Sequence, residues 1–295
     1  MTSEQVLRRL ELTVTRKLDG LLHGEYQGLR PGPGTEPGEA RLYQPGDDVR
    51  RIDWAVTART GEPHVRMPVA ERELETWIVV DLSASLDFGT ADYEKRDIAV
   101  AAVAAVGHLT ARMGNRVGAV IVHGDGATRV PARSGRDHLR ALLHRTISAP
   151  RVDGSGATDL ASALVQAHRL AQRRGLVVVV SDFLSDDRWV RALRAMTARH
   201  EVLGIEVVDP RELELPDVGV LDLVDPETGA RVEVQTGDER LRQRYAEAAA
   251  AQRAAIARSL RDAGADHLVL RTDRDWLRDI VGFVDRRRRR QRGVA

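Results

Sequence analysis

The sequence of 295 residues contains no cysteine, which sets firm limits on its chemistry. Disulfides, thiol nucleophiles and cysteine-ligated zinc or iron–sulfur sites are all excluded, and the absence fits a reducing compartment. The chain also has no large excess of charge of either sign, because 45 lysine and arginine residues nearly balance 44 aspartate and glutamate residues. The chain as a whole therefore has no excess charge with which to hold nucleic acid or a membrane, and any such role has to be local.

Long apolar runs are missing from the start of the chain, "MTSEQVLRRLELTVTRKLDG", which is charged throughout. It lacks the uninterrupted apolar segment of a signal peptide or a membrane span, so we expect a cytoplasmic protein. Several catalytic motifs are also missing. No HExxH pair, no GxxxxGK[ST] phosphate loop and no GxSxG nucleophile elbow occurs, which argues against a zinc protease, a nucleotide-binding enzyme and a serine hydrolase.

Two segments precede the main part of the chain. Residues 1–24 contain leucine and valine at helical spacing from Glu4 to Leu22, which predicts an amphipathic helix. Residues 25–72 are broken by "RPGPGTEPGE", "QPGDD" and "RTGEPH", a pattern of turns and brief strands rather than helices. We therefore expect a small β-rich appendage there.

From residue 73 to residue 285, predicted strands alternate with predicted helices. Examples are a strand at Thr76 to Val80, a helix at Asp92 to Met113 and the strand "LVVVVS" at Leu176 to Ser181. This alternation predicts an α/β domain in which a mostly parallel sheet is covered by helices on both faces. A hairpin is expected to interrupt it near residues 213–235, and residues 286–295 form a basic tail.

Polar side chains gather where predicted strands end. Ligands of open α/β sheets bind beyond the carboxyl ends of the strands, because the loops there are free to carry chemistry. Oxygen ligands of this kind suit Mg²⁺ or Mn²⁺. The sequence therefore predicts a metal site at the ends of these strands. Its ligands come from "DLSAS", the glycine-rich "DGSGATDL" and the end of "LVVVVSD", and they are Asp81, Ser83, Ser85, Thr158 and Asp182. The alternatives for the same residues are helix caps and ordinary turns.

These motifs carry a resemblance. "DLSAS", the threonine of "GATDL" and the aspartate of "SDF" resemble the metal-ion-dependent adhesion site of von Willebrand factor A domains, with all five positions filled. "YQPGDDVRRIDWAVTARTGEPHV" and "DPRELELP" resemble the bacterial family called domain of unknown function 58, which carries such a domain. The two likenesses together span roughly Gly24 to Leu215.

The resemblance implies a three-layer, Rossmann-like α/β/α domain that binds one divalent cation. Hydroxyls would contact the ion directly, carboxylates would often act through water, and an acidic side chain of a partner protein would complete the metal shell. Family members are commonly encoded beside MoxR-type AAA+ ATPases, which implies an adaptor in the remodelling or maturation of other proteins. Many members also carry two membrane-spanning segments ahead of the "YQPGDD" region, where this chain has its charged helix.

Other functions stay open at this stage. An aspartyl phosphotransferase also ends its first parallel strand in an aspartate, but it favours a second one two residues later, where this chain has Ser83, and no supporting lysine is evident. The cluster Arg286 to Arg290 with Arg292 is either a solvated tail or a contact for anionic lipid or nucleic acid. "YQPGDDVRRIDW" is either a turn with surface ion pairs or a docking segment. We expect a non-enzymatic, metal-dependent interaction module.

Overall fold

The computed structural model describes residues 40–45, 47–66, 75–111, 114–124, 126–151, 159–224 and 229–292. The helix predicted within residues 1–24 lies outside this part of the chain. The molecule divides into two compact units, one formed by Gln27–Glu73 and the other by Met1–Tyr26 together with Leu74–Ala295. Each unit is described by itself.

The smaller unit mixes short strands with helical turns. The two strands in its described part pair in the antiparallel direction. The described elements in chain order are β1 (Ala40–Leu42), η1 (Val49–Arg51), α2 (Trp54–Thr60) and β2 (His64–Arg66). The expectation of turns and brief strands without helices is therefore wrong for the described part of this segment.

Local capping explains why a helix forms there. The side chain of Asp53 accepts hydrogen bonds from the backbone N–H groups of Ala55 and Val56, which have no partner inside the helix. Gly61 ends the helix in the left-handed conformation, with φ of 75°. Proline and glycine turn signals flank this stretch, but the stretch itself is a short sequence with a cap at each end.

The larger unit is built on a six-stranded sheet in the order β10-β7-β6-β3-β4-β5. All neighbouring strands run parallel except β5, which is antiparallel to β4. This confirms the predicted α/β class with a mostly parallel sheet. The strands are β3 (Glu75–Asp81), β4 (Arg116–His123), β5 (Gly126–Arg133), β6 (Gly175–Ser181), β7 (Glu201–Val208) and β10 (Asp266–Arg271).

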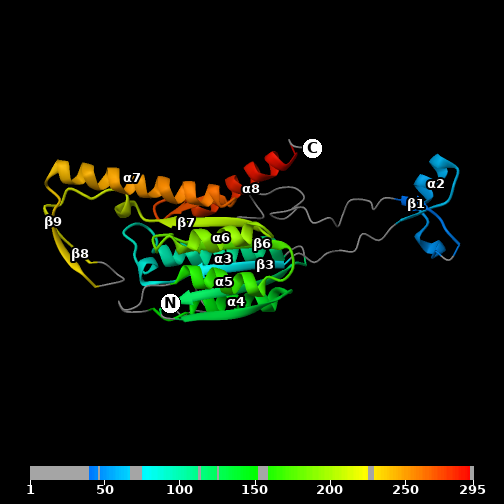
Figure 1. Cartoon of the computed structure of the whole chain (residues 1–295), viewed down its shortest axis with the longest axis horizontal. Helices are drawn as coiled ribbons and strands as arrows, with labels where there is room; N and C mark the ends of the chain where they lie inside the picture. The colour runs from blue at the N-terminus through cyan, green and yellow to red at the C-terminus, as the bar shows by residue number, and fades with distance from the viewer. Residues whose placement is uncertain are drawn as a thin grey trace. The chain divides into compact units, whose positions relative to one another are not determined.

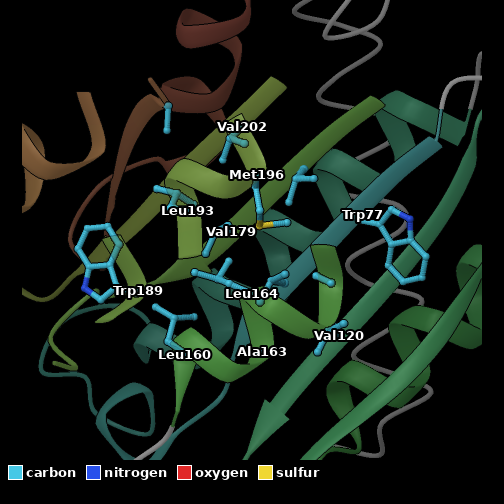
Figure 2. Packing of buried hydrophobic residues seen from close by; sticks show 14 of the residues in the cluster. Trp77, Val120, Leu160, Ala163, Leu164, Val179, Trp189, Leu193, Met196 and Val202 are labelled. Atoms are coloured by element: carbon cyan, nitrogen blue, oxygen red, sulfur yellow. The ribbon is translucent and has the colours of Figure 1, made fainter. Parts of the chain in front are cut away.

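Helices cover the sheet (Figure 1). They are α3 (Lys95–Ala111), α4 (Arg136–Ile147), α5 (Leu160–Leu170), α6 (Arg188–Thr197), α7 (Glu239–Asp262) and α8 (Trp276–Arg292). On one face, apolar side chains of α5 and α6 gather over β3, β4 and β6, as Figure 2 shows, and residues of α7 join the same cluster. Helix α3 packs on the other face and α4 packs against α3. Every residue of β3 and β6 is buried, as expected for central strands covered on both faces.

The antiparallel pair β8 (Val220–Val224) and β9 (Arg231–Gln235) lies within the segment predicted to contain a hairpin. Helix α8 continues to Arg292, so residues 286–292 of the predicted basic tail are helical. Arginine favours helices, and its side chains find partners here. Arg287 lies 2.9 Å from Glu201 Oε2 and 3.2 Å from Asp266 Oδ2, so part of the cluster stabilises the fold. In the described part of the chain, no helix is both long and apolar enough to span a membrane.

The strand order places a switch point beside β3. After β3 the chain adds β4 and β5 on one side, and it then returns to add β6, β7 and β10 on the other side. Loops from the two directions separate at such a point and leave a crevice beyond the carboxyl ends of the strands. The edge of this sheet at which ligand binding is expected therefore lies where β3 and β6 end.

Candidate metal centre

Two buried carboxylates meet at this switch point. Asp81 is the last residue of β3 and Asp182 directly follows β6, and their exposed fractions are 3% and 2%. Oδ1 of Asp81 accepts a hydrogen bond of 3.0 Å from the backbone N–H of Ser83. Its Oδ2 accepts one of 2.8 Å from the hydroxyl of Ser181, at the end of the neighbouring strand. The Asp81 side chain is thus held in one orientation from two strands.

The two serines of "DLSAS" also turn into the site. Their hydroxyl oxygens lie 3.0 Å apart, and both side chains are buried. Ser83 occupies the N-cap position of η2 (Ala84–Leu86), but its side chain makes no capping hydrogen bond. The side chain of Ser85 is among the groups that hold the pKa of Asp182 below its usual range. The capping alternative therefore does not describe Ser83, whose hydroxyl contacts that of Ser85.

The carboxylates repel one another. Burial, followed by the negative charge of Asp182, raises the pKa of Asp81 to about 6, although hydrogen bonds from Ser181 and Ser83 act in the opposite direction. Desolvation and a like charge both disfavour the ionised form of an acid. The hydrogen bonds that Asp81 accepts therefore do not fully offset the cost of ionising this buried carboxyl group beside Asp182.

A lysine balances the Asp182 side. Nζ of Lys95, the first residue of α3, lies 2.8 Å from Asp182 Oδ2 and 2.5 Å from Glu212 Oε1. Burial alone would raise the pKa of Asp182, but the charge and the hydrogen bond of Lys95 outweigh it and hold that pKa below its usual range. The expectation that no lysine supports this site is wrong. One signal was present: among 45 basic residues only Lys17 and Lys95 are lysines.

A network of ion pairs connects Lys95 to residues of β7, α7 and β10. Glu212, in η3 (Pro210–Glu212), also pairs with Arg253 of α7, whose Nη2 lies 3.3 Å from Glu212 Oε2. Nη1 of Arg253 lies 3.0 Å from Oε1 of the buried Glu206, and Nε2 of His267 lies 2.7 Å from Oε2 of the same residue. Arg253 further donates to the carbonyl oxygen of Asp182 at 3.3 Å. Helix α7 is thus tied to the loop that carries Asp182.

The turn after Asp182 is unusual in its backbone. Phe183 has φ of 56°, a left-handed conformation that a bulky residue rarely adopts. Its N–H donates to the hydroxyl of Ser181 at 3.0 Å, and its ring lies 5.0 Å from that of Trp189 between centroids. Packing and hydrogen bonding therefore hold a strained turn in place directly after Asp182.

Four of the five predicted ligands are brought together, namely Asp81, Ser83, Ser85 and Asp182. Thr158 lies outside the described residues. The next residue, Asp159, caps α5, since its side chain accepts a hydrogen bond of 2.9 Å from the backbone N–H of Ser162. The four described residues come from two of the three predicted loops, those after β3 and β6.

The donor set fits a hard divalent cation. Two carboxylates and two hydroxyls converge, and all of them are oxygens of the kind that Mg²⁺ and Mn²⁺ prefer. The repulsion that raises the pKa of Asp81 is what a bound cation would relieve. Among the described residues, no three His, Cys, Asp or Glu side chains gather around one point, so a metal here would depend on serine oxygens.

A sequence profile of the family described as "Protein of unknown function DUF58" matches residues 39–255. The chain belongs to this family. It is 59% identical over 283 residues to the uncharacterized protein Rv1480 of Mycobacterium tuberculosis (strain H37Rv), a match that covers 96% of this chain and 89% of that protein.

Matches among solved structures have lower sequence identity to this member of the DUF58 family. BatB from Bacteroides thetaiotaomicron is 16% identical, with a TM-score of 0.46, over 73% of this chain and 99% of that chain. The VWA domain of SpRpn10 is 14% identical, with a TM-score of 0.39, over 70% of this chain and 93% of that chain. The family assignment rests on the profile and the mycobacterial relative, and the fold class rests on the sheet order.

Proposed function

We propose that this chain is a non-enzymatic protein-interaction module whose binding depends on a divalent cation, Mg²⁺ or Mn²⁺. The observation that supports it best is the convergence of Asp81, Ser83, Ser85 and Asp182 at the switch point of the sheet. The donors come from sequence-distant loops, and both carboxylates are buried and fixed by hydrogen bonds. A set of oxygens prepared in this way favours ion binding over a role in solvent-exposed turns.

The hydroxyls of Ser83 and Ser85 would hold the cation directly, with Asp81 and Asp182 set behind them. Thr158 would add a further hydroxyl from the loop before α5. When bound, the ion supplies a coordination position that an acidic side chain of another protein can fill. Asp81 holds the backbone of Ser83 through the hydrogen bond described above, and the strained turn at Phe183 keeps Asp182 in place.

For the partner we propose a MoxR-type AAA+ ATPase, or a client protein that such an ATPase remodels. The resemblance to the DUF58 family supports this choice, because its members are commonly encoded beside such ATPases. We further propose that the encounter takes place in the cytoplasm and needs an acidic residue on the partner. The chemistry supports the last point, since a cation held largely by neutral hydroxyls keeps charge available for a carboxylate.

The test is capture of a purified candidate ATPase by the full chain, in Mg²⁺ buffer and in buffer with a chelator. Asp81→Ala and Asp182→Asn should abolish capture, because each removes a carboxylate that positions the hydroxyls. Arg289→Ala, on the exposed side of α8, is the control and should capture as the parent does. Circular dichroism would verify that each variant is folded. Undiminished capture in chelator would show that the partner binds another surface, with "YQPGDDVRRIDW" the next candidate.

One observation favours a second candidate, a metal-dependent phosphotransferase. Such an enzyme needs a strand-end aspartate, a lysine and a further carboxylate, and Asp81, Lys95 and Asp182 provide this set. The arrangement is less suited to that reaction than to binding, because Lys95 pairs with Asp182 and Glu212, and Ser83 stands where an acid/base carboxylate is needed. A phosphatase screen with Mg²⁺ on the parent and on Asp81→Asn would decide, since activity lost in the variant would establish the enzyme.

A further inference from the structure

Lys95 is the most deeply buried charged residue of the site, with an exposed fraction of 0%. A buried ammonium is costly unless it is paired and hydrogen-bonded. Here Asp182 Oδ2 and Glu212 Oε1 both accept hydrogen bonds from it. Two carboxylates within hydrogen-bond distance favour the charged form of the side chain.

The ammonium group of Lys95 contacts the candidate metal site and is not simply buried in the core. Asp182 receives the ammonium on Oδ2, while its Oδ1 accepts the backbone N–H of Leu184 at 3.1 Å. Without Lys95, helix α3 would place no buried cation beside the two buried carboxylates, Asp81 and Asp182. The ammonium therefore supplies, as part of the chain, positive charge of the kind that a bound metal would supply.

We propose that Lys95 is a built-in countercation of the candidate metal centre: it keeps Asp182 and its loop in place when no metal is bound, and it limits how tightly the metal binds. The proposal rests on the metal-dependent function proposed above. Its physical basis is that like charges repel, so that a cation entering beside Asp182 meets a positive charge already paired with that residue.

A consequence for partner binding follows. Because Lys95 lowers the affinity of the site for the metal, a partner carboxylate that completes the coordination shell contributes a large share of the total binding free energy. By linkage, the partner then raises metal affinity by the same factor as the metal raises partner affinity. Lys95 thus makes the interaction reversible and makes metal and partner bind together.

Binding of Mn²⁺ alone tests the proposal, measured from the electron paramagnetic resonance signal of the free ion. Lys95→Met, which keeps a long side chain without the charge, should bind Mn²⁺ about tenfold more tightly or better. Glu212→Gln should bind it several-fold more weakly, because Lys95 then loses one of its two acidic partners and the site gains net positive charge. Loss of packing alone would weaken binding in both variants, so opposite signs separate an electrostatic role from a structural one.

Thermal unfolding with and without Mn²⁺ gives a second readout. Lys95→Met should melt well below the parent in chelator and should recover more on addition of Mn²⁺ than the parent gains. Lys95→Arg, which keeps the charge, should behave more like the parent. The matched control is Arg287→Met, which removes another cation paired with two acidic residues, but at the opposite edge of the sheet. It should lose the same stability with and without Mn²⁺.

The outcomes separate the two proposals. If the parent binds Mn²⁺ and Lys95→Met binds it equally or more weakly, the role of Lys95 is refuted and the metal site stands. If only Lys95→Met binds Mn²⁺, the role of Lys95 is supported and metal dependence of the native protein is refuted. If neither binds, both proposals fall. Should Lys95→Met fail to fold, Glu212→Gln decides, because affinity equal to or above that of the parent would refute the role of Lys95.

Discussion

The hydroxyl of Ser181 donates a hydrogen bond of 2.8 Å to Oδ2 of Asp81, which lies 100 positions earlier in the chain. The same hydroxyl oxygen accepts the N–H of Phe183 at 3.0 Å. One buried side chain thus joins the end of β3 to the end of β6 and supports the strained turn beyond it. The candidate site depends on this connection between neighbouring parallel strands.

Ser181→Ala should therefore lower the free energy of unfolding by about 1–3 kcal/mol, because a buried carboxylate and a buried N–H each lose a partner. Urea unfolding would measure the loss. Ser185→Ala is the control, since its buried hydroxyl oxygen has no hydrogen-bond partner among the described residues, and its effect should stay within about 0.5 kcal/mol. Equal effects of the two substitutions would contradict the assigned role of Ser181.

Asp81→Ala should abolish binding of Mg²⁺ or Mn²⁺ in titration calorimetry while the chain stays folded. The substitution removes one of two mutually repelling buried carboxylates, so the loss of hydrogen bonds is partly offset by relief of repulsion. Asp186→Ala is the control, because this exposed aspartate follows β6 as well but pairs with Arg188 outside the site. Metal binding by Asp81→Ala at the parental level would place the metal elsewhere.

Gly175→Ala should destabilise the sheet strongly. Gly175 is the first residue of β6, and a Cβ added there would lie 1.9 Å from the carbonyl oxygen of Glu75 in β3. Backbone atoms cannot yield as a flexible side chain can, so we expect a loss of about 1–3 kcal/mol or more. Gly126→Ala in β5 is the control, because its Cβ would meet no heavy atom within 4 Å. Similar melting temperatures for the two variants would argue against the tight β3–β6 pairing.

His200 should make stability depend on pH. Burial, followed by nearby positive charge, lowers its pKa, and the residues that contribute this charge are His168, Arg199 and Arg174. The rings of His168 and His200 lie 6.0 Å apart between centroids. The folded state thus favours neutral His200, while in the unfolded chain the His200 side chain takes up a proton at about pH 6.5. Its contribution is complete above that pH and declines as the pH falls toward the folded pKa.

The measurement is the difference in melting temperature between about pH 7.5 and about pH 5.5, a window that brackets the ordinary pKa of histidine. His200→Gln should show a smaller acid-side loss than the parent, because glutamine takes up no proton in this range. His144→Gln, exposed on α4, should lose as much as the parent does. An unchanged pH profile in His200→Gln would refute the prediction.

Sequence patterns were sufficient for the fold class and for much of the site. The alternation of apolar strands with helices predicts a parallel sheet, because local periodicity decides which faces of each element need covering. Position along the chain also places Asp81 and Asp182 at strand ends, so their arrival at one edge follows from the sheet being parallel. Helix α2 shows the limit of this reasoning even locally, since Asp53 and Gly61 cap it within a stretch dominated by turn signals.

By itself, the sequence determined which segments of the α/β domain are strands and helices and which oxygens follow the strands, because these depend on near neighbours and on the pattern of burial. Only the tertiary structure decided that β6 lies beside β3, that Ser181 bonds Asp81 and that Lys95 reaches Asp182 and Glu212. The partner of a buried charge is chosen by residues that are distant in the chain. No local rule specifies that choice, because the free energy of burying Lys95 depends on which carboxylates the completed fold brings to it.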